Sequence, residues 1–109
     1  MAKARTVSKR LIARYCRELK TMGIRVDRVL LFGSYAMGRA QEGSDIDLLV
    51  ISPSWAPYNE RERLEILGIA AARILEPIQA RGATPEEVEN NDLPLFFQEV
   101  LKQQAIAVA

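Results

Sequence analysis

The chain has 109 residues, of which 49% are hydrophobic and 27% are charged, and its 15 basic and 14 acidic side chains nearly cancel. This length suits one domain, and the composition is that of a globular protein with a hydrophobic core. One cysteine and no histidine exclude an internal disulfide, His/Cys zinc sites, and Ser-His-Asp or Cys-His catalysis. Any chemistry must therefore rest on carboxylates and a metal ion.

Charge and hydropathy along the chain bear on location and partners. No apolar run approaches the roughly 20 residues that a membrane-spanning helix needs, and the cysteine usage fits a reducing compartment, so we expect a cytoplasmic protein without a membrane partner. Residues 1–28 hold nine basic side chains and two acidic ones. This basic segment is either a solvated helix face or a surface for phosphate, RNA or an acidic protein.

In the first half of the chain, the hydrophobic pattern predicts a helix and two strands. Apolar residues recur at helical spacing over residues 8–22. The apolar run 29–32 predicts a buried strand that ends at Gly33, and a turn of small residues follows over 34–44. Residues 46–51 predict a second strand.

The next segments predict a capped helix and a third strand. Asn59 with Glu62 three residues later is typical of a helix N-terminus, and the apolar spacing extends that helix to Leu75. Residues 77–83 are the candidate for the third strand.

The last segments predict two helices and an edge strand. Residues 84–87, Thr-Pro-Glu-Glu, form a second capping box, a further helix begins near Pro94, and 105–108 predict a final edge strand. We therefore predict an α+β fold in which one domain, residues 1–109, has the order αβαβαβα.

Two aspartates stand at the start of the second predicted strand. Because side chains on a strand alternate between its faces, Asp45 and Asp47 project together, opposite Ile46, Leu48 and Val50. Two neighbouring carboxylates repel each other unless a cation neutralises them. Mg²⁺ binds such oxygens and keeps coordination positions for phosphates, so the pair predicts a metal site.

A glycine–serine turn ends the first predicted strand. Gly33 lets the backbone approach a ligand closely because it has no Cβ, and Ser34 offers a hydroxyl and a backbone N–H at the predicted start of a short helix, which suits a phosphate. Alone, a Gly-Ser turn is usually only a turn, and an Asp-x-Asp pair is more often a loop or a cap. Together they indicate a nucleoside triphosphate held against Mg²⁺.

The segment FGSYAMGRAQEGSDIDLLV, with Gly33-Ser34, ten intervening residues and Asp45-x-Asp47, resembles the signature of the DNA polymerase β-like nucleotidyltransferases. More narrowly it resembles the minimal nucleotidyltransferases (MNT), the small partners of HEPN proteins in two-gene modules. The resemblance covers nearly the whole chain and implies a small mixed sheet flanked by helices. It implies transfer of a nucleoside monophosphate from ATP or another NTP to a hydroxyl, with two Mg²⁺ ions held by three carboxylates. Several MNT proteins are antitoxins that attach AMP to a tyrosine of a HEPN toxin.

Carried over to this chain, the resemblance implies that Gly33 and Ser34 bind the triphosphate. It implies that Asp45 and Asp47 are the catalytic metal ligands.

The chain departs from the family pattern at two positions. The arginine that often follows the serine by three residues is Met37 here, and Arg39 is close enough to replace it as a nucleotide contact, although an exposed turn residue is the more ordinary interpretation. The position of the third carboxylate corresponds to Gln79, which has an oxygen but no negative charge. Glu76 is the alternative third ligand, although its more ordinary role is to end the preceding helix. With Gln79 in place of the carboxylate, turnover is expected to be slow or absent.

Three functions are consistent with this pattern. The leading hypothesis is a Mg²⁺-dependent transferase that moves AMP from ATP to a HEPN partner and acts as its antitoxin, in a homo- or hetero-oligomer. The alternative is a non-catalytic nucleotide-binding module that neutralises a HEPN partner by contact. An RNA-binding accessory domain is the third, and we do not expect RNA as the partner.

Four aromatic residues have less specific assignments. Trp55 and Tyr58 lie in a Pro-bounded loop and are expected to line the cleft or to contact a partner. Phe96 and Phe97 are expected in the core, with at least one of them as a candidate for an interface.

Overall fold

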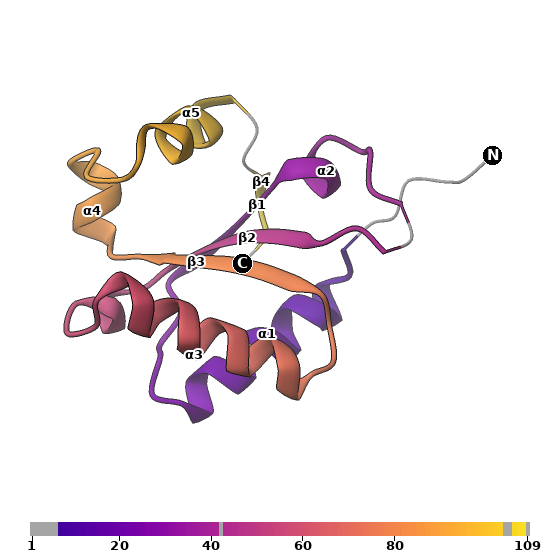
Figure 1. The fold of residues 1–109 in the computed structure, drawn as a ribbon, viewed down its shortest axis with the longest axis horizontal. Helices are drawn as coiled ribbons and strands as arrows, with labels where there is room; N and C mark the ends of the chain where they lie inside the picture. Colours follow the sequence, from indigo (N-terminus) through magenta and orange to yellow (C-terminus); the bar gives the residue numbers. More distant parts are fainter. Residues whose placement is uncertain (1–6, 42, 104–105, 109) are drawn as a thin grey trace.

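The computed structural model describes residues 7–41, 43–103 and 106–108, and its centre is a four-stranded sheet (Figure 1). In the order in which they pair, the strands are β3 (Ile78–Ala83), β2 (Ile46–Ile51), β1 (Arg28–Phe32) and β4 (Ile106–Ala107). Strand β1 runs antiparallel to both β2 and β4, whereas β2 runs parallel to β3. The predicted α+β fold with a mixed sheet is confirmed.

Helices cover both faces of this sheet (Figure 1). One face carries the two longest helices, α1 (Lys9–Thr21) and α3 (Glu60–Arg73). The other carries α4 (Pro85–Glu89) and α5 (Leu95–Gln103). The remaining helical elements are α2 (Gly33–Ala36) and the 3-10 turn η1 (Pro53–Trp55). Since parallel strands need a crossover connection, α3 links β2 to β3.

Helix α1 begins where the sequence predicted it. The side chain of Ser8 caps α1 by accepting a hydrogen bond from the backbone N–H of Leu11 at 3.0 Å. Such caps are worth about 1 kcal/mol each. Lys3 and Arg5 of the basic segment lie outside the described residues, as does Ala105 of the predicted edge strand.

Two capping boxes confirm the predicted starts of α3 and α4. At the start of α3, Asn59 and Glu62 exchange backbone and side-chain hydrogen bonds of 2.8 and 2.9 Å. At the start of α4, Thr84 and Glu87 do the same over 3.2 and 2.7 Å.

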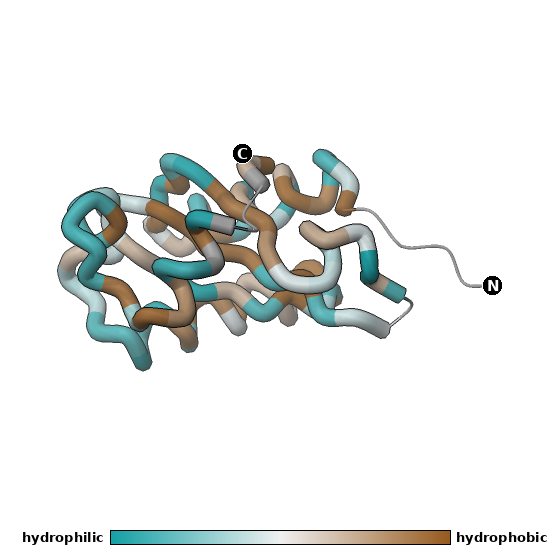
Figure 2. The backbone as a smooth tube through the Cα atoms, turned by 90° about the horizontal axis from the view of Figure 1, so that it is seen from above, coloured by the Kyte–Doolittle hydropathy of each residue, from teal (hydrophilic) through white to brown (hydrophobic). Residues whose placement is uncertain are grey.

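The core lies mainly between the sheet and the α1–α3 layer. Its members are apolar side chains that are almost completely buried, among them Ile12, Tyr15, Leu19, Val29, Leu31, Ile46, Leu48, Val50, Trp55 and Leu67. A smaller buried cluster, Leu30, Phe32, Leu49, Ile51 and Ala83, lies on the opposite face under α5. Figure 2 shows that hydrophilic stretches gather in the outer turns. No helix in the described part of the chain is both long and apolar enough to cross a membrane.

The expectation that Trp55 lines a cleft or contacts a partner is wrong. Its side chain is 0% exposed, and its indole N–H donates to the carbonyl oxygen of Val50 at 3.1 Å. The ring packs on Gly82 so closely that a Cβ there would lie 2.8 Å from it. Tyr58 is half-buried and meets Trp55 edge-on, with ring centroids 6.3 Å apart. These two aromatic residues belong to the core and its border.

Candidate active site

The candidate site begins with a row of three residues across the sheet. The strand register aligns Phe32 with Asp47, and Asp47 with Gln79. Residues paired across neighbouring strands point to the same face, so the three side chains all lie on the α5 side. The position expected to hold a third carboxylate is thus next to Asp47, and Gln79 occupies it.

Gly33 lies against the carboxylate of Asp47. Its φ of 70° is in the left-handed region, and a Cβ added there would collide with Oδ2 of Asp47. A side chain at this position would therefore be strained and would also displace the carboxylate. The close approach of a ligand at Gly33 stays a prediction from the sequence; the group that the structure places against Gly33 is Asp47.

The two aspartates influence each other. Burial raises the pKa of the Asp47 carboxyl above its usual value, and the nearby negative charge of Asp45 raises it further. Asp47 is half-buried on β2, whereas Asp45 is exposed just before this strand begins. A cation between the two carboxylates would offset both effects.

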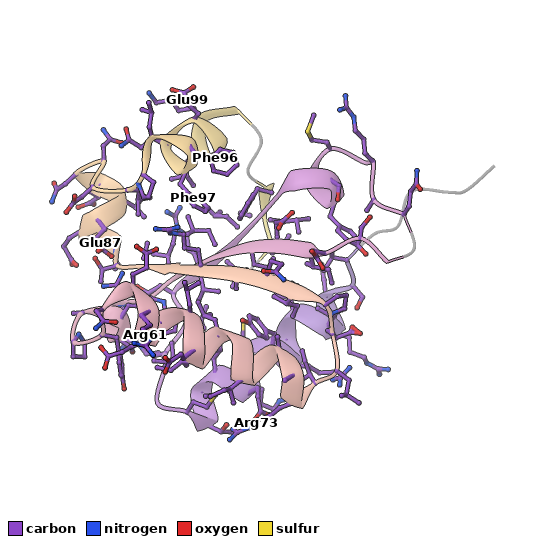
Figure 3. All side chains as sticks on the ribbon, in the orientation of Figure 1. Arg61, Arg73, Glu87, Phe96, Phe97 and Glu99 are labelled. Atoms are coloured by element: carbon purple, nitrogen blue, oxygen red, sulfur yellow. The ribbon has the colours of Figure 1, made fainter. Side chains whose placement is uncertain are left out.

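A cavity of about 370 Å³ opens above this row of residues. It is lined by residues of the sheet, α3 and α5: Phe32, Gly33, Asp47, Leu64, Gln79, Ala80, Arg81, Phe96 and Phe97. The structure therefore brings together three residues that the sequence singled out, Gly33, Asp47 and Gln79. Figure 3 shows Phe96 and Phe97 on the side of α5 that is turned to the sheet.

The other predicted site residues, Ser34, Arg39, Asp45 and Glu76, are not among the residues that line this cavity. Ser34 follows Gly33 in α2 and is half-buried, and its carbonyl oxygen accepts a hydrogen bond from the backbone N–H of Arg39 at 2.8 Å. The side chain of Arg39 is exposed. Glu76 lines two other hollows, one with Tyr35 and one with Gln79.

Arg81 lines the cavity, and sequence reasoning missed it. It lies two residues after Gln79 on β3 and therefore on the same face of the sheet. Its guanidinium forms an ion pair with Glu60 and lies 4.7 Å from the centre of the Phe97 ring. The available signal was the i, i+2 spacing from Gln79.

Oxygen donors for a hard cation are present at one side of the cavity. Asp45 and Asp47, with the side-chain carbonyl of Gln79, are the residues that could hold Mg²⁺, which prefers carboxylate and carbonyl oxygens. Within the described ranges, no group of three or more His, Cys, Asp or Glu residues could hold a metal ion. The donor set fits one Mg²⁺, and a carboxylate set for a second ion is absent from these residues.

Comparisons with known proteins identify the family. The model of the nucleotidyltransferase domain family matches residues 9–103. A relative described as a putative protein adenylyltransferase, from Methanocaldococcus jannaschii, is 40% identical over 40 residues. This match spans 37% of the present chain and 40% of the relative's length.

Solved structures share the fold at low sequence identity. A toxin–antitoxin structure with AMP-PNP matches with a TM-score of 0.62 and 16% identity, over 94% of this chain and 73% of the other. A complex of a tri-AMPylated HEPN toxin of Shewanella oneidensis with an MNT antitoxin matches with a TM-score of 0.53 and 14% identity, over 93% and 68% of the two chains. With the family model matched from α1 to the end of α5, this chain belongs to the nucleotidyltransferase domain family.

Proposed function

We propose that this protein transfers AMP from ATP to a hydroxyl group of a HEPN-family partner, with release of pyrophosphate, and thereby acts as its antitoxin. The observation that carries the proposal is the contact of Gly33 with Asp47, beside Gln79, in the wall of one cavity. It is supported by the family match, by the adenylyltransferase description of the relative, and by the toxin–antitoxin complexes with this fold.

Each predicted residue has a role in this proposal. Asp45 and Asp47 hold Mg²⁺, which supplies positive charge to the phosphates when bound. The backbone at Gly33 and the hydroxyl and N–H of Ser34 bind the triphosphate. Arg39 contacts the nucleotide from the exposed side of the turn.

Gln79 limits the chemistry of the site. Its amide oxygen can orient a ligand beside Asp47, but it neither carries negative charge nor accepts a proton at neutral pH. The acceptor hydroxyl must lose its proton during transfer, and a carboxylate at this position would assist that loss. We therefore propose that the protein is a slow transferase.

Exposed apolar side chains border the cavity and suit a protein acceptor. Leu64 contributes from α3 and Phe96 from α5, where Phe96 is 62% exposed. Leu95, next to Phe96, is also largely exposed. Apolar side chains grouped at a cavity mouth are typical of a binding surface, and here that surface would receive the partner chain.

A second function is favoured by Gln79. Because the described residues lack a third carboxylate at the metal site, the protein could bind ATP without transferring AMP and neutralise its HEPN partner by contact. In that case the surface around Phe96 would bind and neutralise the partner, and ATP would be bound without being consumed.

One experiment separates the two functions. The protein is incubated with labelled ATP, Mg²⁺ and the HEPN protein that we expect the neighbouring gene to encode, and the partner's intact mass and ribonuclease activity are measured. A mass gain of one AMP with loss of ribonuclease activity, absent in Asp45→Asn/Asp47→Asn, supports the transferase. Inhibition without a mass gain supports the contact mechanism. If the partner is neither modified nor inhibited, both proposals are contradicted.

A further inference from the structure

Arg81 is the basic side chain among the residues that line the candidate site. The other charged lining residue is Asp47, and Gln79 lies between them in the strand register, neutral. Arg81 is two residues beyond Gln79 on the same strand, about 6.6 Å along it. A long arginine side chain can span such a distance, so the guanidinium can reach a ligand bound over Gln79.

The guanidinium is held in position before any ligand arrives. It forms an ion pair with Glu60 at the start of α3 and lies over the ring of Phe97 from α5. Arg81 is 24% exposed, whereas Glu60 is 56% exposed. The charge is thus partly shielded from water, which strengthens its interaction with an anion, and its present partner is free to move into solvent.

Because Gln79 is neutral, the cavity wall repels an anionic ligand less than a wall with a further carboxylate would. With Gln79 in the row, the wall charges of Asp47 and Arg81 cancel. A guanidinium also presents a planar set of N–H donors that matches two phosphate oxygens at once. A phosphate chain that starts at Gly33 would meet these N–H donors at the other side of the same cavity.

We propose that Arg81 binds the phosphate chain of the nucleotide and exchanges its ion pair with Glu60 for phosphate oxygens. The inference rests on the proposed function in one respect, namely that ATP occupies this cavity. It adds a binding residue, Arg81, outside the Gly33–Asp47 motif. It also makes Glu60 a group that competes with the phosphate for Arg81.

Binding of labelled ATP with saturating Mg²⁺ tests this role without any need for turnover. Arg81→Gln should weaken ATP binding about tenfold or more, the value of a charge-assisted hydrogen bond. Glu60→Gln should strengthen it several-fold, because the competitor is gone, and should have no effect when Arg81 is already Gln. The matched control is Arg61→Gln, which removes the same charge from a side chain that is 88% exposed and paired with Glu65 on α3. It should bind ATP as the natural protein does.

Competition with fragments of ATP identifies the part that Arg81 contacts. Tripolyphosphate should compete less well in Arg81→Gln than in the natural protein, while adenosine should compete equally in both. A selective loss of adenosine competition would mean that Arg81 packs on the base, and would overturn the proposal. Unchanged ATP affinity in a folded Arg81→Gln would also overturn it.

Two further outcomes keep the inference distinct from the proposed function. If Arg81→Gln does not fold, Glu60→Gln decides, and unchanged ATP affinity in that variant contradicts the exchange. If ATP binding is lost in Asp45→Asn/Asp47→Asn but kept in Arg81→Gln, the proposed function stands and only the role of Arg81 fails. If the natural protein binds no ATP, both fail together.

Discussion

The two faces of the sheet are built from the same strands but differ in what they bury. On the face covered by α1 and α3, β2 contributes Ile46, Leu48 and Val50, and each is almost completely buried. On the opposite face the same strand begins with Asp47, beside Gln79, and only its later residues are apolar. Alternation along one strand thus separates a packed layer from a layer that holds polar groups.

This division shows how a small domain can carry a carboxylate that its own structure disfavours. The pKa of Asp47 is raised by burial and by Asp45, which means that the ionised form weakens the fold. The α1–α3 face compensates with buried apolar area and with satisfied polar groups, such as the Tyr15 hydroxyl that donates to the Leu67 carbonyl at 2.9 Å. Stability and chemistry therefore belong to opposite faces, and substitutions can test that separation.

The largest effects should come from removing the two proposed metal-binding carboxylates or, on the other face, one buried side chain. Asp45→Asn/Asp47→Asn should abolish Mg²⁺ and Mn²⁺ binding and lower AMP transfer on the order of 10³-fold, about 4 kcal/mol of transition-state stabilisation, while the protein stays folded. Leu48→Ala should cost about 2–5 kcal/mol of unfolding free energy and leave the metal affinity of the folded protein unchanged. Calorimetric titration with Mn²⁺ and urea unfolding measure the two quantities. Unaltered metal affinity in the double variant would contradict the site assignment.

Two glycine substitutions, one on each face of the sheet, should have smaller effects on stability and should differ in their effect on metal affinity. Gly82→Ala places a Cβ 2.8 Å from the Trp55 ring, and such overpacking costs about 1–3 kcal/mol of stability. Gly33→Ala costs about 1–2 kcal/mol for its left-handed backbone and, in addition, pushes the Asp47 carboxylate aside. Only Gly33→Ala should weaken metal binding in titrations of both variants. Equal metal affinities in the two would show that Gly33 has a structural role alone.

Local chemistry explains which features could be predicted from the sequence. The capping boxes at Asn59 and Thr84 depend on residues three positions apart, and the placement of Asp47 depends on strand alternation, so short-range rules sufficed. The match of Gln79 to the third-carboxylate position was inferred through the family resemblance, because Asp47 and Gln79 are 32 positions apart and no short-range rule joins them.

Features that depend on long-range packing were missed. Trp55 looked like a loop residue because nothing near it in sequence reveals that Gly82 leaves room for its ring. Arg81 looked like an ordinary strand residue because its partners, Glu60 and Phe97, come from helices on either side of it in the chain. Tertiary contacts of this kind leave no local pattern.

Gln79→Glu should make the α5 face more acidic and raise the rate of AMP transfer. A third carboxylate beside Asp47 would strengthen metal binding and assist proton loss from the acceptor, and about 1.4 kcal/mol of transition-state stabilisation would raise AMP transfer tenfold. Transfer to the same acceptor at saturating Mg²⁺ is the measurement. Glu76→Gln is the control, because Glu76 lines other hollows and its loss should not matter. A flat rate in Gln79→Glu with activity abolished in Glu76→Gln would make Glu76 the third ligand.

The smallest expected effect is a change in the pH dependence of stability. The pKa of Asp47 is higher in the folded protein than in the unfolded chain, so the folded state binds the proton more tightly. The free energy of unfolding therefore falls as the pH rises from the unfolded pKa, about 3.9, through the raised folded pKa. An asparagine side chain cannot ionise, so Asp47→Asn should unfold at a higher temperature than the natural protein at neutral pH in EDTA. The difference should vanish below the unfolded pKa, where both side chains are neutral.

Asp45→Asn removes only the neighbouring charge and should give a smaller gain, since burial is the larger cause of the shift. Added Mg²⁺ should stabilise the natural protein and not Asp47→Asn, because it binds only the folded, ionised site. Thermal melts followed by circular dichroism across this pH range provide the test. If Asp47→Asn were the less stable protein at neutral pH in EDTA, the carboxylate would have favourable partners in the fold, and the proposed conflict between stability and chemistry on this face would be wrong.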